Sequence, residues 1–135
     1  MTSRTGHCYC GEVQYTSSGP ATMQALCQCR ECQYITGGSP NAFMVVDEAG
    51  FEITQGATKS FTRSDLPNPV TREFCANCGT HLITRAPGLS GSLVLKVGSL
   101  DDPSEFEPGM AIFACDKQSF HQIPDGVPAY ERFPS

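Results

Sequence analysis

The segment Phe74–His81, FCANCGTH, holds two cysteines that are separated by two residues and followed at once by a glycine. This spacing lets a tight turn wrap a metal ion, and Gly79 supplies the backbone freedom that such a turn needs. A C-x-x-C pair also occurs in thiol redox proteins, where it lies in a β-α-β pattern and opens a long helix. Here the short β-like segment His81–Thr84 follows instead, so the motif favours a metal-binding pair.

A second pair, Cys8 and Cys10, lies near the N-terminus in the segment GHCYCG. In an extended chain residues two apart point the same way, so both sulfur atoms can face one ion. Each pair supplies half of the tetrahedron that a closed, structural zinc site requires. We therefore predict that Cys8, Cys10, Cys75 and Cys78 bind one structural zinc ion.

The segment Ala25–Gly38, ALCQCRECQYITGG, adds Cys27, Cys29 and Cys32. Three thiolates on a zinc ion leave its fourth position open, which is the arrangement of catalytic zinc sites. An ion held in this way polarises a ligand at the open position or binds a substrate thiol as thiolate. The sequence therefore predicts a second zinc site, whose occupancy can be partial.

Other interpretations of this triplet stay open. It can hold no metal and present exposed thiols, or a fourth protein ligand can close the site. Cys115 follows the apolar run 111–114, which predicts a buried packing residue rather than a ligand. The histidines lack the spacing of a ligand pair, so we expect them in polar packing or behind the ligands: His7, His81 and His121.

Composition bears on how the 8 cysteines are used. The N-terminal residues lack the apolar core of a secretory signal, so we expect a cytoplasmic protein, whose thiols stay reduced. This disfavours a disulfide scaffold. A net charge of −5 and a pI of about 5.0 argue against nucleic acid or an anionic membrane as partner. No apolar run approaches the ~20 residues of a membrane span.

Glycine (13) and proline (10) are frequent, which is typical of short strands joined by turns. A short helix is predicted from Arg30 to Thr36, ending at Gly37, and Asp102-Pro103 predicts one further helical turn. The residues after Asp116 are expected to be irregular. We predict one mainly β domain over residues 1–135, with these strands: Glu12–Thr16, Ala42–Asp47, Phe51–Thr54, Lys59–Arg63, Thr80–Arg85, Ser92–Gly98 and Met110–Cys115.

The ordered set GHCYCG, CQCRECQYITGG and FCANCGTHL resembles the glutathione-dependent formaldehyde-activating enzymes, a family grouped with centromere protein V. The later segments KVGSLDDP and DGVPAYERFP also resemble this family. The resemblance implies a β-tent fold, in which small antiparallel sheets are held by zinc. It also implies a structural zinc on Cys8, Cys10, Cys75 and Cys78, and a second, reactive zinc on Cys27, Cys29 and Cys32.

The family's named reaction adds glutathione to formaldehyde, so the resemblance implies a carbon–sulfur lyase acting in the synthetic direction. Gln28 and Gln33 stand where the family commonly has histidine and arginine. A glutamine offers a carboxylate of glutathione only a neutral hydrogen bond, so we expect glutathione or a similar small thiol to bind weakly. The alternative function is a non-catalytic zinc module for a protein or metabolite partner.

Two loaded zinc–thiolate sites take the formal charge from −5 to about −8. An anionic thiol therefore needs basic side chains at the open site. The sequence leaves the oligomeric state open, and it does not show which of the basic residues converge: Arg30, Arg63, Arg72, Arg85 and Lys96.

Overall fold

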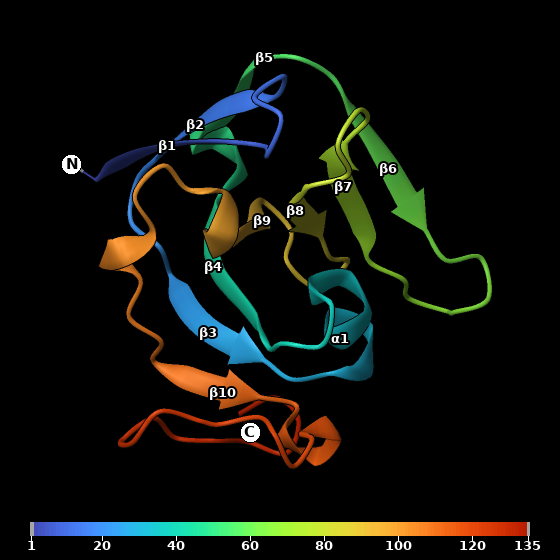
Figure 1. Ribbon diagram of the computed structural model, residues 1–135, viewed down its shortest axis with the longest axis vertical. Helices are drawn as coiled ribbons and strands as arrows, with labels where there is room; N and C mark the ends of the chain where they lie inside the picture. Colours follow the sequence, from blue (N-terminus) through green and yellow to red (C-terminus); the bar gives the residue numbers. More distant parts are fainter. Residues whose placement is uncertain (1, 135) are drawn as a thin grey trace.

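The protein, described over residues 2–134 in a computed structural model, consists mainly of two β-sheets (Figure 1). The smaller sheet has the strand order β1-β2-β5 and the larger the order β10-β3-β4-β9-β8-β7-β6. All strand pairs are antiparallel except β10 with β3. The strands are β1 (Ser3–His7), β2 (Gln14–Ser18), β3 (Met23–Cys27), β4 (Asn41–Asp47), β5 (Phe51–Gln55), β6 (Thr58–Thr62), β7 (Thr71–Cys75), β8 (His81–Arg85), β9 (Ser92–Lys96) and β10 (Met110–Ile112).

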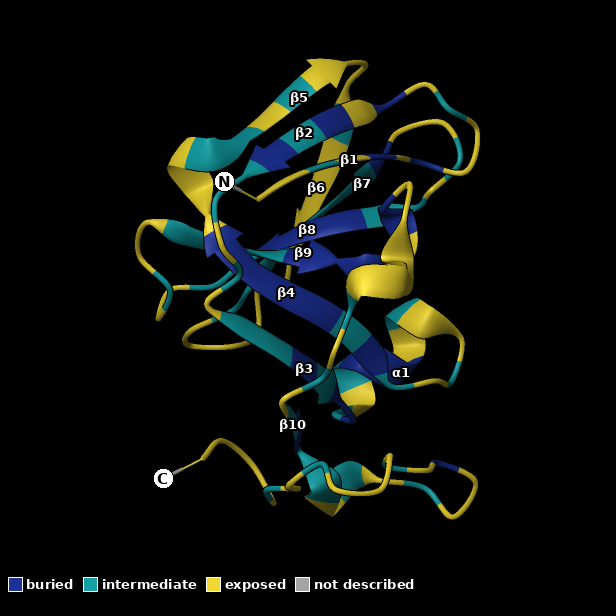
Figure 2. Cartoon of the chain, turned by 90° about the vertical axis from the view of Figure 1, so that its left-hand side faces the viewer, coloured by how far each residue is buried: buried dark blue, intermediate teal, exposed yellow. Residues whose placement is uncertain are grey.

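The middle of the large sheet is buried, as the dark strands β4, β8 and β9 show in Figure 2. Side chains from both faces of strand β4 are packed in a hydrophobic core. Met44 and Val46 join the core beneath the small sheet, and Phe43 and Val45 join a second core with β3 and β10. Each buried side chain of this size contributes about 1.5–3 kcal/mol. The mainly β fold predicted from the sequence is confirmed.

The helix α1 spans Arg30–Thr36, as predicted. Its N-cap is Cys29, whose sulfur accepts a hydrogen bond from the backbone N–H of Cys32 at 3.3 Å. Gly37 ends the helix in the left-handed conformation at φ 79°, where glycine carries no steric penalty. Short 3₁₀ turns cover Glu48–Gly50 (η1), Val97–Ser99 (η2), Pro103–Glu105 (η3) and Ala114–Asp116 (η4), and Asp102 caps η3 as predicted.

Strands β1, β3 and β7 were not predicted. Strand β1 is polar, and Gly6 is its only buried residue. It is held by partners from elsewhere in the chain, because the Thr5 carbonyl accepts from the Asp101 N–H at 2.9 Å and Gly6 bridges to Leu100. A polar strand such as β1 has no periodic apolar pattern of its own, so only long-range pairing reveals it.

The prediction of a buried Cys115 was wrong. Strand β10 ends at Ile112 rather than at residue 115, because Phe113 adopts a left-handed φ of 56° and turns the chain out of the sheet. The turn η4 follows and leaves Cys115 exposed. The chain beyond η4 is irregular, as predicted. It returns to β10, where Tyr130 N–H donates to the Ala111 carbonyl at 2.9 Å.

We predict that Gly6→Ala destabilises the protein by about 1–3 kcal/mol, the usual cost of overpacking a core. A Cβ at this position would overlap the Tyr15 hydroxyl and the Ser99 carbonyl. Gly98→Ala is the matched control, because a Cβ there meets nothing within 4 Å. Urea unfolding of both variants measures the difference. Equal midpoints would show that β1 is not tightly seated on the core.

Candidate metal centres

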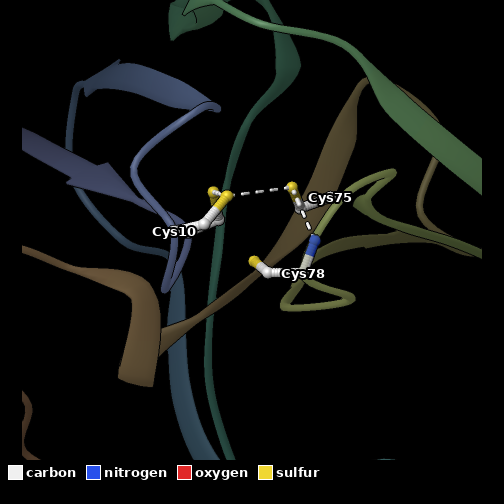
Figure 3. A group of neighbouring side chains, drawn as sticks. Cys10, Cys75 and Cys78 are labelled. Atoms are coloured by element: carbon white, nitrogen blue, oxygen red, sulfur yellow. Dashed lines mark hydrogen bonds between the residues drawn. The ribbon is translucent and has the colours of Figure 1, made fainter.

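The four cysteines predicted for the structural zinc lie together. Their sulfur atoms are all within 4.8 Å of one another. Cys8 Sγ lies 3.6 Å from Cys10 Sγ, and Cys10 Sγ lies 3.8 Å from Cys75 Sγ. Figure 3 shows the sulfur atoms of Cys10, Cys75 and Cys78 facing one another. A tetrahedral ion with Zn–S bonds of about 2.3 Å separates its sulfur ligands by about 3.8 Å, so the donor set fits zinc.

Hydrogen bonds into these sulfur atoms favour the thiolate form. Backbone N–H groups of Val13 and Asn77 point at Cys8 Sγ and Cys75 Sγ, at 3.2 Å and 3.3 Å. The Thr80 hydroxyl lies 3.2 Å from Cys78 Sγ, and this contact lowers the pKa of Cys78 to about 5. A thiol with a pKa of about 5 is ionised at neutral pH, which is the form that binds metal.

This cluster joins the two sheets. Cys8 and Cys10 follow β1 of the small sheet, whereas Cys75 ends β7 and Cys78 lies in the turn to β8 of the large sheet. Tyr9 N–H also donates to Thr80 Oγ1 at 3.0 Å across the same gap. An ion on these sulfur atoms therefore closes a long loop of the chain.

The second cluster contains Cys27, Cys29 and Cys32, with sulfur atoms within 4.8 Å of one another. Cys27 ends β3, Cys29 caps α1 and Cys32 lies in the first turn of that helix. Hydrogen bonds from Cys27 and then Cys32 lower the pKa of Cys29 to about 2, and the same pairing raises the pKa of Cys27. The cluster is therefore poised to carry negative charge, which a bound cation stabilises.

Among residues 2–134, neither Cys115 nor any histidine joins the two clusters as a further ligand. Cys115 is exposed, with its sulfur 4.0 Å from Asp116 Oδ1. His7 Nδ1 lies 2.6 Å from Asp101 Oδ1, and His121 Nε2 lies 2.6 Å from the Gly38 carbonyl. The prediction that these histidines serve polar packing is consistent with those contacts.

Lys96 is the basic residue that lies deepest beside the triplet. Cys27 pairs with Asn41, and Lys96 pairs with Phe43 two residues further along β4, so both side chains face the same side of the sheet. Lys96 is 6 % exposed and forms no ion pair within the described chain. Burial lowers its pKa to about 8, although negative charge on Cys32 opposes this effect.

Arg72 on β7 is the second basic group near the triplet. Its guanidinium lies 2.9 Å from Glu31 Oε1 on α1, and its charge helps to lower the pKa of Cys29. Of the other candidates, Arg85 pairs with Glu73 and Glu48 on a different part of the sheet. The basic groups that converge on the triplet are therefore Lys96 and Arg72.

The two glutamines lie inside the protein, which the sequence did not indicate. Gln33 Nε2 donates to the carbonyls of Gln28 and Asp116, both at 2.9 Å, and Gln33 Oε1 accepts from Arg30. Gln33 thus ties α1 to the segment after β10. Gln28 is fully buried, and neither polar atom of its side chain has a partner within the described residues. These long-range contacts leave no local signal in the sequence.

The mainly β frame carries two thiol clusters that could each hold a metal ion, one with four sulfur atoms and one with three. The chain belongs to the family of glutathione-dependent formaldehyde-activating enzymes, whose family model matches residues 3–116. The resemblance seen in its motifs is thereby confirmed.

A crystal structure of a Rhodobacter sphaeroides protein is similar to this chain, with a TM-score of 0.60 and 16 % identity. The match covers 72 % of this chain and 87 % of that one, and it supports the fold alone. No curated protein matches the sequence. Within residues 2–134, no helix has the length and apolar character needed to cross a membrane.

We predict that Cys75→Ser prevents stable folding, because a structural zinc contributes on the order of 10 kcal/mol to a domain that needs it. Cys115→Ala is the control. This exposed thiol should change the unfolding free energy by no more than about 0.5 kcal/mol and leave the metal content unchanged. Metal analysis and thermal unfolding measure both. A folded Cys75→Ser protein with wild-type zinc would contradict the assignment.

Proposed function

We propose that both clusters bind zinc and that the protein adds a small thiol to formaldehyde, or releases it, at the site of Cys27, Cys29 and Cys32. The observation that carries this proposal is the three-sulfur cluster, which has no fourth protein ligand within the described chain. The family's printed description supports the same chemistry. The four-sulfur cluster then has a purely structural role.

The reaction is a carbonyl addition without a change of oxidation state overall. A thiol RSH and H₂C=O give RS–CH₂–OH: a C–S bond forms, the C=O π bond breaks, and the thiol proton ends on the oxygen. Zinc with an open position supplies a site at which the thiol ionises near neutral pH. The remaining task of the protein is to accept the extra negative charge and to orient the two reactants.

Lys96 is suited to the first part of this task. Three thiolates on Zn²⁺ carry a charge of −1, so a further thiolate would be repelled without a nearby cation. The ammonium of Lys96 offsets that charge from within the buried face of the sheet. It also provides a donor for the oxygen that becomes negative as the C–S bond forms.

Arg72 is the second basic residue near the three cysteines. Its side chain is 13 % exposed and is fixed by the ion pair with Glu31. This pair connects β7 to α1, the helix that begins at Cys29 and contains Cys32. The ion pair thereby fixes the position of the helix relative to the sheet. This position sets the direction from which a substrate approaches.

We predict that Cys29→Ser keeps the fold and reduces zinc from two equivalents toward one. Serine is a good N-cap residue, so α1 should persist, and the closed site should be untouched. The wild type should also accelerate exchange between formaldehyde and its thiol adduct, and this variant should not. Metal analysis and two-dimensional NMR exchange spectroscopy give the two readouts. Two firmly held zinc ions in the variant would contradict an open site on these cysteines.

We further predict that Lys96→Met weakens thiol binding by about tenfold, the value of a hydrogen bond to a charged group. Thermal stability should change little, because the variant removes the desolvation cost of the buried ammonium together with its attraction to the cysteine cluster. Lys117→Met, at an exposed position, is the control. Calorimetry with 2-mercaptoethanol measures the affinity. Unchanged affinity in Lys96→Met would show that this charge does not act on the bound thiol.

A further inference from the structure

A largely apolar groove of about 400 Å³ lies between α1 and the outer strands of the large sheet. Its volume is within the range of about 300–1,000 Å³ that is usual for small-molecule sites. One wall is the face of α1 that carries Glu31, Tyr34 and Ile35, which stand at helical spacings of three and four. The opposite wall comes from β6, β7, β8 and the loop after β6: Phe61, Arg63, Leu66, Pro69, Val70, Arg72, Phe74 and His81.

The groove adjoins the open cysteine cluster. Its helical wall begins two residues after Cys29, and Cys32 lies in the same first turn. Arg72 belongs to the lining of the groove and donates at 2.9 Å to Glu31, two residues after Cys29. Strand register places Phe61 opposite Arg72, so the aromatic ring and the guanidinium share one face of the sheet. A molecule held at the cluster by its thiol can therefore extend along this groove.

The exposed apolar side chains of the groove are unusual for a surface. Tyr34 is 80 % exposed, Phe61 59 % and Leu66 37 %, and all three line the same hollow. Isolated apolar side chains on a surface need no explanation, but a group of them around a concave site is typical of a binding surface. Their rings offer stacking area for an aromatic or branched ligand.

The charges of the groove do not suit glutathione. The two guanidinium groups of the groove already have carboxylate partners. Arg63 binds Asp65 through two contacts of 2.9 Å and 2.6 Å, and Arg72 binds Glu31. Glutathione would bring two further carboxylates and an ammonium group, and these would lie against an apolar lining at a cost in desolvation. His81, in the same wall, leaves its Nδ1 without a partner within the described residues, and that atom is buried.

We propose that this groove binds an aromatic or other apolar group of the substrate, so that the protein prefers apolar thiols to glutathione. This inference rests on the proposed function, because it takes the thiol of the substrate to be held at the Cys27, Cys29 and Cys32 site. The apolar group lies between Tyr34 and Phe61.

The test compares phenylmethanethiol, 2-mercaptoethanol and glutathione by calorimetry with the zinc-loaded protein. Phenylmethanethiol should bind at least about tenfold more tightly than 2-mercaptoethanol. Of these two thiols, only phenylmethanethiol has a ring that the groove can remove from water. Glutathione should bind no better than 2-mercaptoethanol. Equal affinities for all three thiols would overturn the inference and leave the proposed function intact.

Variants show which side chains cause the preference for phenylmethanethiol. Phe61→Ser, on the edge strand β6, should reduce the preference for phenylmethanethiol over 2-mercaptoethanol toward one without changing zinc content. Phe133→Ser is the matched control, since this ring is 65 % exposed and lies outside the groove. A preference that survives Phe61→Ser and Tyr34→Ser would overturn the inference, because the ring would then bind elsewhere.

Benzyl alcohol separates the inference from the proposed function, because it carries the same ring without a thiol. It should shift the NMR signals of Tyr34 and Phe61 in the wild type. If it does so while no thiol binds, the groove is an apolar site and the proposed thiol chemistry fails. If benzyl alcohol leaves these signals unchanged and sedimentation shows a dimer that Phe61→Ser dissociates, the groove is an interface between copies and the inference fails.

Discussion

The fold depends on the contact between Cys10 and Cys75, whose sulfur atoms lie 3.8 Å apart although 65 residues separate them in the chain. Four thiolates this close repel one another unless a cation lies between them. With a cation the same sulfur atoms become the link between the small sheet and the large one. Several backbone N–H groups support this arrangement, so the loops around the cluster are shaped to hold charge on sulfur.

We expect the three-cysteine cluster to depend on the four-cysteine cluster. Its three sulfur atoms come from the end of β3 and the start of α1, a local unit that does not itself connect the two sheets. A site that is not needed to hold the fold together can leave one position of its metal free for a ligand. Gln33 reinforces this unit through the Asp116 carbonyl, which fixes the helix against the segment after β10.

The surroundings of the open cluster differ in character on its two sides. Lys96 brings a buried positive charge from the core side, and the groove beyond Arg72 presents aromatic and aliphatic side chains. Positive charge beside the cysteines favours ionised sulfur, whereas the apolar lining favours a substituent that leaves water readily. The chain thus combines the family's cysteine pattern with a largely apolar groove nearby.

The sequence by itself determined what depends on local spacing. The C-x-C and C-x-x-C pairs indicated the two clusters, and Gly37 set the end of α1, because ligand bite and helix capping involve residues only a few positions apart. Tertiary structure alone decided the rest. Strands β1, β3 and β7, the exposure of Cys115, the approach of Lys96 and the groove all follow from strand register and from the left-handed turn at Phe113. These features arise from pairings between distant segments, which leave no periodic trace in the residues themselves.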